Sequence, residues 1–237
     1  MNAIRKAGGL LLGVALMAGC TERNASTGPT GRSTGALSAD VTTANSSVVS
    51  DPAGDVAKGT QGYLDIIGAR ITKKGGVFVF TMDLATALPD NPPVPSSADM
   101  IEWHFSLDTD PTAFPAGYPF TKNSAGFQDF LIEHRVYRSG FTDPFDPTSS
   151  PGILTDRRPL LTGGQPIVAP ITFSIDGAKL TWVVDAALLN DPSTFQWGLA
   201  TAAAHAGADV KNGYNTITLF DVAPEIFSGA PLATWPQ

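Results

Sequence analysis

The stretch that decides the fold is DPAGDVAKGTQGYLDIIGARITKKGGVFVFTMDL, residues 51–84. It contains an acidic turn, a β-branched strand, a Lys-Gly-Gly turn and a second strand. Gly75 and Gly76 close a hairpin because glycine supplies the positive φ that such a turn needs. In the second strand one face carries Phe78, Phe80, Met82 and Leu84, and the other carries Val77, Val79, Thr81 and Asp83. This period of two predicts a half-buried strand.

The rest of the chain reads as further strands between turns rich in proline and glycine. We expect strands at residues 63–72, 77–84, 101–107, 127–138, 153–161, 171–175, 179–184, 195–203 and 214–220. Asp176-Gly177 is a strong hairpin signal, and residues 185–189 suit a single helical turn. No segment has sustained helical periodicity. The strand number, roughly eight to ten, predicts an all-β fold, an antiparallel two-sheet β-sandwich of jelly-roll-like form.

The first twenty residues have the three parts of an export signal. A basic start at Arg5 and Lys6 precedes an apolar run at residues 10–17, which is too short to span a bilayer, and small residues precede Cys20. The ending Leu16-Met17-Ala18-Gly19-Cys20 resembles the lipobox of bacterial lipoproteins. The resemblance implies cleavage before Cys20 and diacylation of its thiol. The alternative is an ordinary secreted protein in which Cys20 falls there by chance.

Composition then divides the chain into three parts. Residues 1–19 are the expected signal peptide. Residues 20–45 are rich in Ser, Thr, Gly and Ala without apolar periodicity, so we expect a flexible linker that carries lipidated Cys20. Residues 46–237 are long enough for one sandwich with a sizeable core. Thr21 stands where an inner-membrane retention signal would have Asp, so the lipoprotein rule implies the outer membrane of a bacterial envelope.

Net charge and cysteine content limit the binding partners and the disulfide bonds that we expect. Removal of the signal peptide leaves thirteen basic residues against twenty-two acidic ones, a net charge of −9. A domain this acidic is a poor partner for phosphate backbones, which argues against nucleic acid. Cys20 is the only cysteine, so no disulfide can form within the chain, and the fold depends on its core. Acidic side chains are, however, the ligands that calcium prefers.

The order of several short motifs resembles the family 9 carbohydrate-binding module and related DOMON-like sandwiches. These motifs are Asp51-Pro52-x-Gly54-Asp55, Leu64-Asp65-Ile66, Leu107-Asp108-Thr109-Asp110, Gly126-Phe127-x-Asp129-Phe130-Leu131-Ile132 and Asp221-x-Ala223-Pro224. The similarity spans nearly all of residues 48–225. Members of this superfamily bind sugars, some bind haem, and many bacterial ones carry structural calcium. The resemblance therefore implies a binding role, although the fold alone does not choose the ligand.

The acidic turn is the expected calcium site. Asp51 and Asp55 flank a Pro-Ala-Gly turn that would direct carboxylates and carbonyls to one point, and Asp221 joins them if the terminal strands pair. Asp65 is a weaker fourth candidate. Alternatively, Asp51 and Asp55 only cap the turn by accepting hydrogen bonds from nearby amides. A separate pair, Asp108 and Asp110, is either a second oxygen site or a solvated strand end.

Sugar binding would need exposed aromatic rings. Trp103 and Trp182 each share a face with apolar residues, which favours core packing, and the sequence does not place Trp197 or Trp235. No residue here matches the stacking tryptophan pair of the carbohydrate-binding family, so the sequence does not assign ligand-binding residues.

Catalytic chemistry has little support. His104, His134 and His205 with Glu102 or Glu133 lack the paired spacing of a zinc enzyme, and His134 lies on an apolar face. Met82 or Met100 with a histidine would suit haem but forms no local motif. We therefore expect a non-catalytic lipoprotein whose calcium-stabilised sandwich binds carbohydrate. The alternatives are a structural or protein-interaction lipoprotein without a small ligand, and a haem-binding module.

Overall fold

The computed structural model describes residues 45–110, 129–143, 148–206, 214–224 and 231–236. All of them belong to one compact unit that spans Val41–Gln237. The expected signal peptide, Cys20 and the linker up to residue 44 lie outside the described residues, as does the start of the strand predicted at residues 127–138. Within the described ranges, no helix is both long and apolar enough to cross a membrane.

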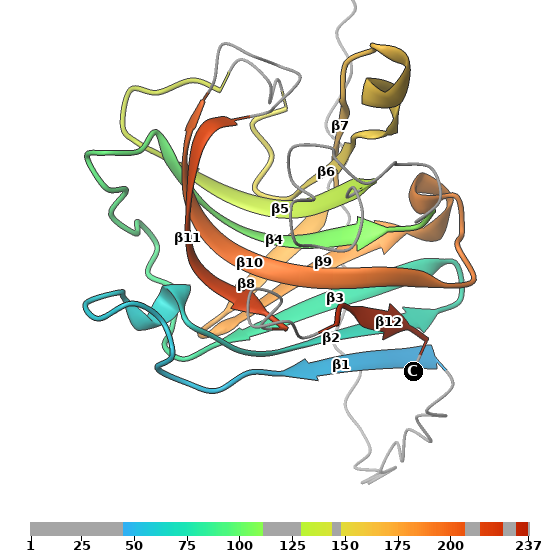
Figure 1. Cartoon of the computed structure of the whole chain (residues 1–237), viewed down its shortest axis with the longest axis horizontal. Helices are drawn as coiled ribbons and strands as arrows, with labels where there is room; N and C mark the ends of the chain where they lie inside the picture. Colours follow the sequence, from blue (N-terminus) through green and yellow to red (C-terminus); the bar gives the residue numbers. More distant parts are fainter. Residues whose placement is uncertain (1–44, 111–128, 144–147, 207–213, 225–230, 237) are drawn as a thin grey trace, which may run out of the picture. The chain divides into compact units, whose positions relative to one another are not determined.

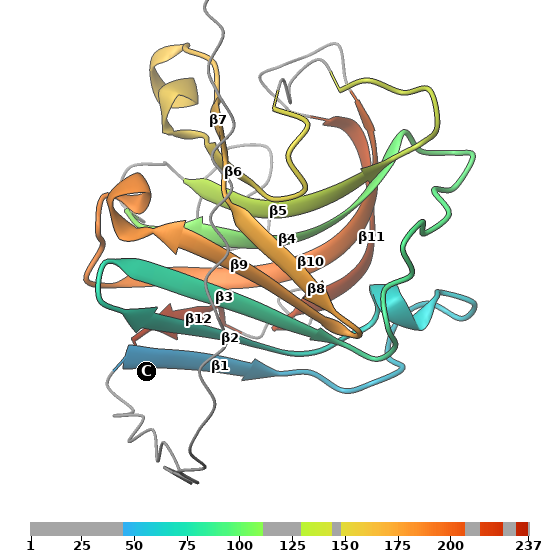
Figure 2. The ribbon, with the colours of Figure 1, turned by 180° about the vertical axis from the view of Figure 1, so that it is seen from behind.

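The first sheet, sheet A, contains five antiparallel strands in the order β1-β2-β3-β9-β8 (Figure 2). The strands are β1 (Ser46–Ser50), β2 (Ile66–Lys74), β3 (Val77–Leu84), β9 (Lys179–Asp185) and β8 (Thr172–Asp176). The predicted hairpins form as expected, because Gly75 and Gly177 both adopt a φ of +60° at the β2–β3 and β8–β9 turns.

The second sheet, sheet B, has seven strands that lie against sheet A (Figure 1). Its order is β11-β10-β4-β5-β6-β7, and β12 pairs with β10 beside this path. The strands are β11 (Tyr214–Ala223), β10 (Phe195–Ala206), β4 (Met100–Asp108), β5 (Phe130–Tyr137), β6 (Ile153–Asp156), β7 (Ile167–Pro170) and β12 (Ala233–Trp235). All pairings are antiparallel. The predicted all-β, two-sheet antiparallel sandwich is confirmed.

Short helical segments connect some of the strands. They are η2 (Gly62–Leu64), η3 (Arg158–Thr162) and η4 (Ala186–Leu189). The helical turn predicted at residues 185–189 forms as η4, and the Asp185 side chain accepts a hydrogen bond from the Ala187 amide as its N-cap. The strand predicted at residues 153–161 ends early, at Asp156, because η3 begins with Pro159 in its first turn.

The inner faces of the two sheets make the core. Sheet A contributes Phe78, Phe80, Met82, Leu84, Leu180, Trp182 and Val184, and sheet B contributes Ile101, Trp103, Phe105, Leu107, Phe130, Ile132, Trp197 and Leu199. Phe105 packs edge-on against Phe80 and Trp182, with ring centroids 5.3 Å and 5.6 Å away, so aromatic contacts cross between the sheets. The expected core roles of Trp103 and Trp182 are confirmed, and both rings are fully buried.

At one side of the sandwich the sheets are joined by polar contacts. The Trp197 indole on β10 donates to Ser47 Oγ on β1 at 2.9 Å, and Ser47 donates in turn to the Thr234 carbonyl on β12 at 2.8 Å. Close to this seam, β2 of sheet A contacts β11 of sheet B. The seam places the loop after β1 beside the end of β11, where the acidic residues lie.

Candidate metal centre

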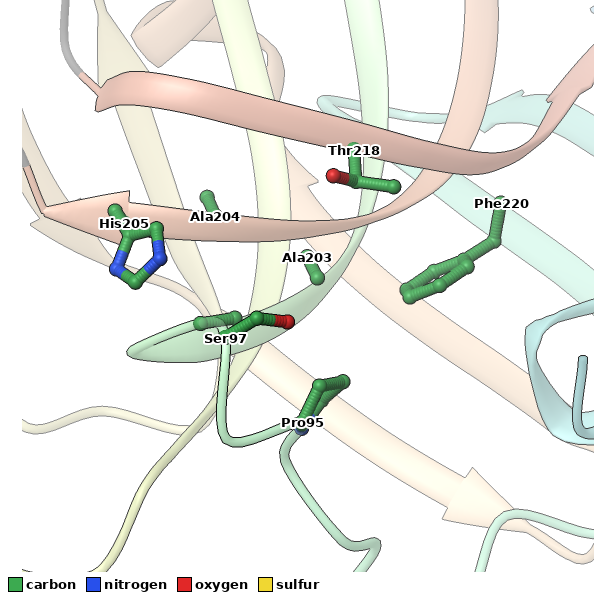
Figure 3. Close-up of a pocket in the computed structure, with 8 residues that line it drawn as sticks. Pro95, Ser97, Ala203, Ala204, His205, Thr218 and Phe220 are labelled. Carbon is green, nitrogen blue, oxygen red and sulfur yellow. The ribbon is translucent and has the colours of Figure 1, made fainter.

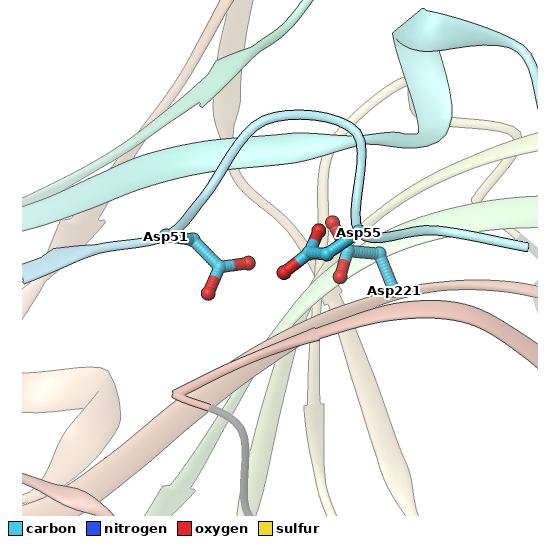
Figure 4. Close-up of side chains that lie close together, drawn as sticks. All are labelled: Asp51, Asp55 and Asp221. Atoms are coloured by element: carbon cyan, nitrogen blue, oxygen red, sulfur yellow. The ribbon is translucent and has the colours of Figure 1, made fainter.

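The loop after β1 carries two of the four predicted calcium ligands. Strand β1 ends at Ser50, and Gly54 turns the chain with a φ of +83°, a conformation that glycine adopts without steric cost. The Gly54 amide donates to Asp65 Oδ2 at 2.8 Å, which fixes the turn against the start of β2. This loop brings the carboxylates of Asp51 and Asp55 towards β11 (Figure 4).

Asp221 comes from the opposite sheet, on β11. Its Oδ2 accepts a hydrogen bond from the Ile66 amide of β2 at 2.5 Å, and its Oδ1 accepts one from the Val222 amide at 2.8 Å. These two bonds hold the carboxylate across the seam between the sheets, with 6% of the residue exposed. The side chain is therefore fixed in orientation before any ligand binds.

The three aspartates converge on one point. One carboxylate oxygen from each of Asp51, Asp55 and Asp221 lies within 4.8 Å of the other two (Figure 4). Asp55 is exposed, Asp51 is partly buried and Asp221 is buried. Asp65, the weaker candidate, is not a member of this triad but lies buried beside it. While Asp65 Oδ2 holds the Gly54 amide, its buried Oδ1 accepts no hydrogen bond from the described residues.

The electrostatics of Asp221 reflect this crowding. Burial, followed by the negative charges of Asp55 and Asp65, raises the pKa of Asp221 to about 6, although the Ile66 and Val222 amides oppose the rise. Carboxylates gathered in a partly buried place repel one another unless a cation or a proton balances them. The cluster thus carries an electrostatic cost that a bound cation would remove.

The donor set fits a hard divalent cation. Ca²⁺ takes six to eight oxygen ligands, which mix carboxylates with carbonyls and water. Asp51, Asp55 and Asp221 would supply carboxylate oxygens, and Asp65 has one buried oxygen to offer. Sulfur and imidazole ligands, which zinc prefers, are absent from this triad. The structure brings together three of the four residues that the sequence nominated and places the fourth against the turn itself.

The tryptophans do not offer a sugar-stacking surface. Trp103, Trp182 and Trp197 are fully buried and Trp235 is 2% exposed. The large hydrophobic residues that are exposed in the described ranges are aliphatic: Val48, Ile67, Leu161, Ile167, Ile175, Leu188 and Leu219. Trp197 and Trp235, which the sequence left unplaced, therefore belong to the core.

One small pocket lies where β10 and β11 meet the segment before β4 (Figure 3). Its volume is about 130 Å³, and its lining includes the half-buried Phe220 ring, His205 and the hydroxyls of Ser97 and Thr218. His205 Nδ1 lies 3.2 Å from Asp99 Oδ2, so the carboxylate orients the imidazole at the pocket wall. The pocket is smaller than a typical small-molecule site, and it brings an aromatic residue together with hydroxyl and imidazole side chains.

The histidines are held in separate environments. His134 is stacked between Trp103 and Phe173, with ring centroids 5.4 Å and 4.3 Å away, and its Nδ1 lies 2.7 Å from the Pro151 carbonyl. It is thus the core histidine that its apolar face predicts. His104 lies on the opposite face of sheet B, 3.2 Å from Glu102 Oε1. The described contacts place His104, His134 and His205 with different partners and do not assemble them as metal or haem ligands.

Sequence reasoning missed a buried charge network on the outer face of sheet B. Glu133 is fully buried, accepts hydrogen bonds from Arg135 at 2.8 Å and 2.9 Å, and accepts another from Thr155 Oγ1 at 2.8 Å. Arg135 also donates to Asp143 at 3.2 Å, and Tyr137 donates to the same oxygen at 3.0 Å. The signal was present, because acid and base alternate at i, i+2 on β4 and β5.

Glu102 on β4 completes this network. Burial disfavours its charged form, but the hydrogen bond and charge of His104, followed by the charges of Arg135 and Arg157, outweigh it and hold the pKa of Glu102 below its usual value. In the β4–β5 register Glu102 faces Arg135, and His104 faces Glu133. Each acid is thus opposite a base, an arrangement that suits a structural network better than a catalytic carboxylate pair.

Comparison with known proteins adds no relative. No protein-family model matches the chain, and no curated protein matches it either. Function is therefore inferred from the side chains and their geometry.

Proposed function

We propose that this chain is a non-catalytic lipoprotein of the bacterial cell envelope whose β-sandwich is stabilised by a calcium ion. The observation that carries the proposal is the convergence of Asp51 and Asp55 from the sheet A side with Asp221 from sheet B. Calcium held by these residues would clamp the two sheets at their seam. The site is structural in this proposal, since it lies at the seam between the two sheets.

The size of the stabilisation follows from mass action. A ligand that binds only the folded chain stabilises it by about 2.7 kcal/mol at a hundredfold excess over its dissociation constant. Relief of repulsion among four carboxylates, two of which, Asp65 and Asp221, are buried, would lower this dissociation constant. We therefore expect a large dependence of thermal stability on calcium.

The test is thermal unfolding of the full-length chain in calcium and in chelator. Calcium should raise the melting temperature of the wild type, and Asp55→Asn should lose most of that increase. Asp55 is exposed, so the substitution should leave the melt in chelator almost unchanged. Asp90→Asn, at an exposed loop position, is the matched control and should keep the full calcium response. Equal loss in calcium and chelator would mean that Asp55 only caps the turn.

Membrane attachment through Cys20 is the second part of the proposal. It is supported by the lipobox-like sequence and by the low-complexity linker that follows. Thr21 after Cys20 supports delivery to the outer membrane.

Carbohydrate is the ligand class we propose for the pocket between β10, β11 and the segment before β4. The observation that favours it is that Phe220, Ser97 and Thr218 line the same pocket. A glycan panel screened by thermal shift should find a stabilising sugar, and Phe220→Ala should abolish the shift. No shift with any glycan would favour the alternative, an envelope lipoprotein with a structural or protein-interaction role.

A further inference from the structure

Two further buried carboxylates, those of Asp108 and Asp129, lie where β4 ends and β5 begins. Leu107 and Phe130 are paired in register, so Asp108 at the end of β4 and Asp129 just before β5 are cross-strand neighbours. Asp108 is 3% exposed and Asp129 is 1% exposed. The solvated strand end that the sequence also allowed for Asp108 is therefore wrong, whereas its sequence partner Asp110 is exposed.

Asp129 is oriented by the turn after β4. Its Oδ2 accepts hydrogen bonds from the Thr109 amide at 2.8 Å, the Thr109 hydroxyl at 2.6 Å and the Asp110 amide at 3.1 Å. Three donors on one oxygen fix the plane of the carboxylate. Its other oxygen, Oδ1, is buried and accepts no hydrogen bond from the described residues.

The carboxylate of Asp108 has fewer hydrogen-bond partners than that of Asp129. Both of its carboxylate oxygens are buried, and neither has a hydrogen-bond partner of acceptable geometry in the described part of the chain. Three buried carboxylate oxygens, two from Asp108 and one from Asp129, therefore lack a hydrogen-bond donor among the described residues. Burying a charge without a partner is strongly unfavourable, so such groups normally bind a cation or a proton.

The cation whose charge acts on Asp129, Arg158, is already engaged. Arg158 donates to both oxygens of Asp156, at 2.9 Å and 2.7 Å, and its guanidinium lies over the Phe130 ring. It acts on Asp129 only at longer range. Burial, followed by the charge of Asp129, raises the pKa of Asp108 to about 6, and the nearby Asp110 amide offsets only part of that rise.

We propose that Asp108 and Asp129 bind a second calcium ion. Both residues offer carboxylate oxygens, which suit calcium better than zinc. Gln196 of β10 is the register partner of Asp108, and its amide oxygen is a candidate neutral ligand. This site would join β4 to β5 within sheet B, whereas the Asp51-Asp55-Asp221 site joins the two sheets.

Equilibrium dialysis of the full-length chain against radioactive calcium counts the ions and separates the two sites. We expect about two bound ions per wild-type chain and about one in each of Asp108→Asn and Asp55→Asn. If only the seam site exists, the wild type and Asp108→Asn each bind about one ion, and Asp55→Asn binds none. If only the Asp108–Asp129 site exists, the wild type and Asp55→Asn each bind about one ion, and Asp108→Asn binds none. Failure of this inference is thus distinguishable from failure of the proposed function.

Asp108→Asn changes a buried residue, so the exposed Asp55→Asn variant provides a measurement that does not depend on its folding. If Asp55→Asn still binds one calcium ion, the second site is supported. If Asp55→Asn binds no calcium, the second site is overturned. A proton shared between Asp108 and Asp129 is the competing explanation. It predicts no calcium on Asp55→Asn and an unchanged ion count in Asp108→Asn.

Discussion

The amide of Ile66 donates a 2.5 Å hydrogen bond to Oδ2 of Asp221, and this bond joins sheet A to sheet B beside the candidate calcium site. The other oxygen of Asp221 holds the Val222 amide. Asp221 is thus both a structural acceptor and a proposed ligand. Asp55 is exposed, and in our proposal its carboxylate serves only the ion.

This difference predicts distinct behaviour for two Asp→Asn variants. Asp221→Asn replaces one of two acceptor oxygens by an N–H donor that faces a backbone amide, and should cost about 1–3 kcal/mol in the free energy of unfolding even in chelator. Asp55→Asn should cost nothing measurable there. Urea unfolding of both variants in chelator checks the prediction, and equal free energies would contradict the structural role of Asp221.

Ser47 is the second residue that links the sheets. It relays a hydrogen bond from the Trp197 indole to the Thr234 carbonyl and is fully buried. Ser47→Ala should leave the indole N–H of Trp197 without an acceptor and should destabilise the fold by about 1–3 kcal/mol. Ser46→Ala, on the adjacent and more exposed residue of β1, is the matched control. If urea unfolding gave the two variants the same stability, the relay would not matter.

His134 predicts a pH dependence of stability. Burial lowers the pKa of His134 from its ordinary value of 6.5, although the hydrogen bond with the Pro151 carbonyl partly opposes this shift. Below pH 6.5 the unfolded chain binds a proton that folded His134 refuses, so the free energy of unfolding should fall as the pH drops towards the lowered pKa. His134→Phe, which keeps an aromatic ring between Trp103 and Phe173, should flatten this slope. Urea unfolding at pH 7 and pH 5 measures this change in the free energy of unfolding. If the wild type and His134→Phe changed by the same amount, the buried neutral imidazole would be contradicted.

Membrane attachment gives the simplest genetic prediction. Cys20→Ala should release the protein into the aqueous phase of a detergent partition, because the thiol is the proposed site of diacylation. A Ser38→Ala change in the proposed linker is the control and should leave partitioning unaltered. Continued recovery of Cys20→Ala in the detergent phase would rule out the lipid anchor.

The fold was largely predictable from the sequence because period-two patterns and glycine turns are local signals. Phe78, Phe80 and Met82 lie on the predicted core face of β3, and Gly177 closes the predicted hairpin. Three strands, β1, β7 and β12, were not predicted, since segments of three to five residues are too short to show alternation.

The sites were only partly predictable. Asp51 and Asp55 are close in sequence, and their turn was recognisable, but the contact of Asp221 with Ile66 depends on how two sheets pack. The pairing of Asp108 with Asp129 also needed the β4–β5 register, in which Leu107 lies opposite Phe130. Burial of all four tryptophans was a tertiary outcome that no local pattern could give for Trp197 and Trp235.

The most direct test of the central claim is a crystal structure of the protein grown in calcium, with anomalous diffraction data. We predict an anomalous peak among the carboxylates of Asp51, Asp55 and Asp221, with calcium–oxygen distances of about 2.3–2.6 Å. A structure in calcium with no peak there, and with Asp51 and Asp55 bonded only to backbone amides, would contradict the account.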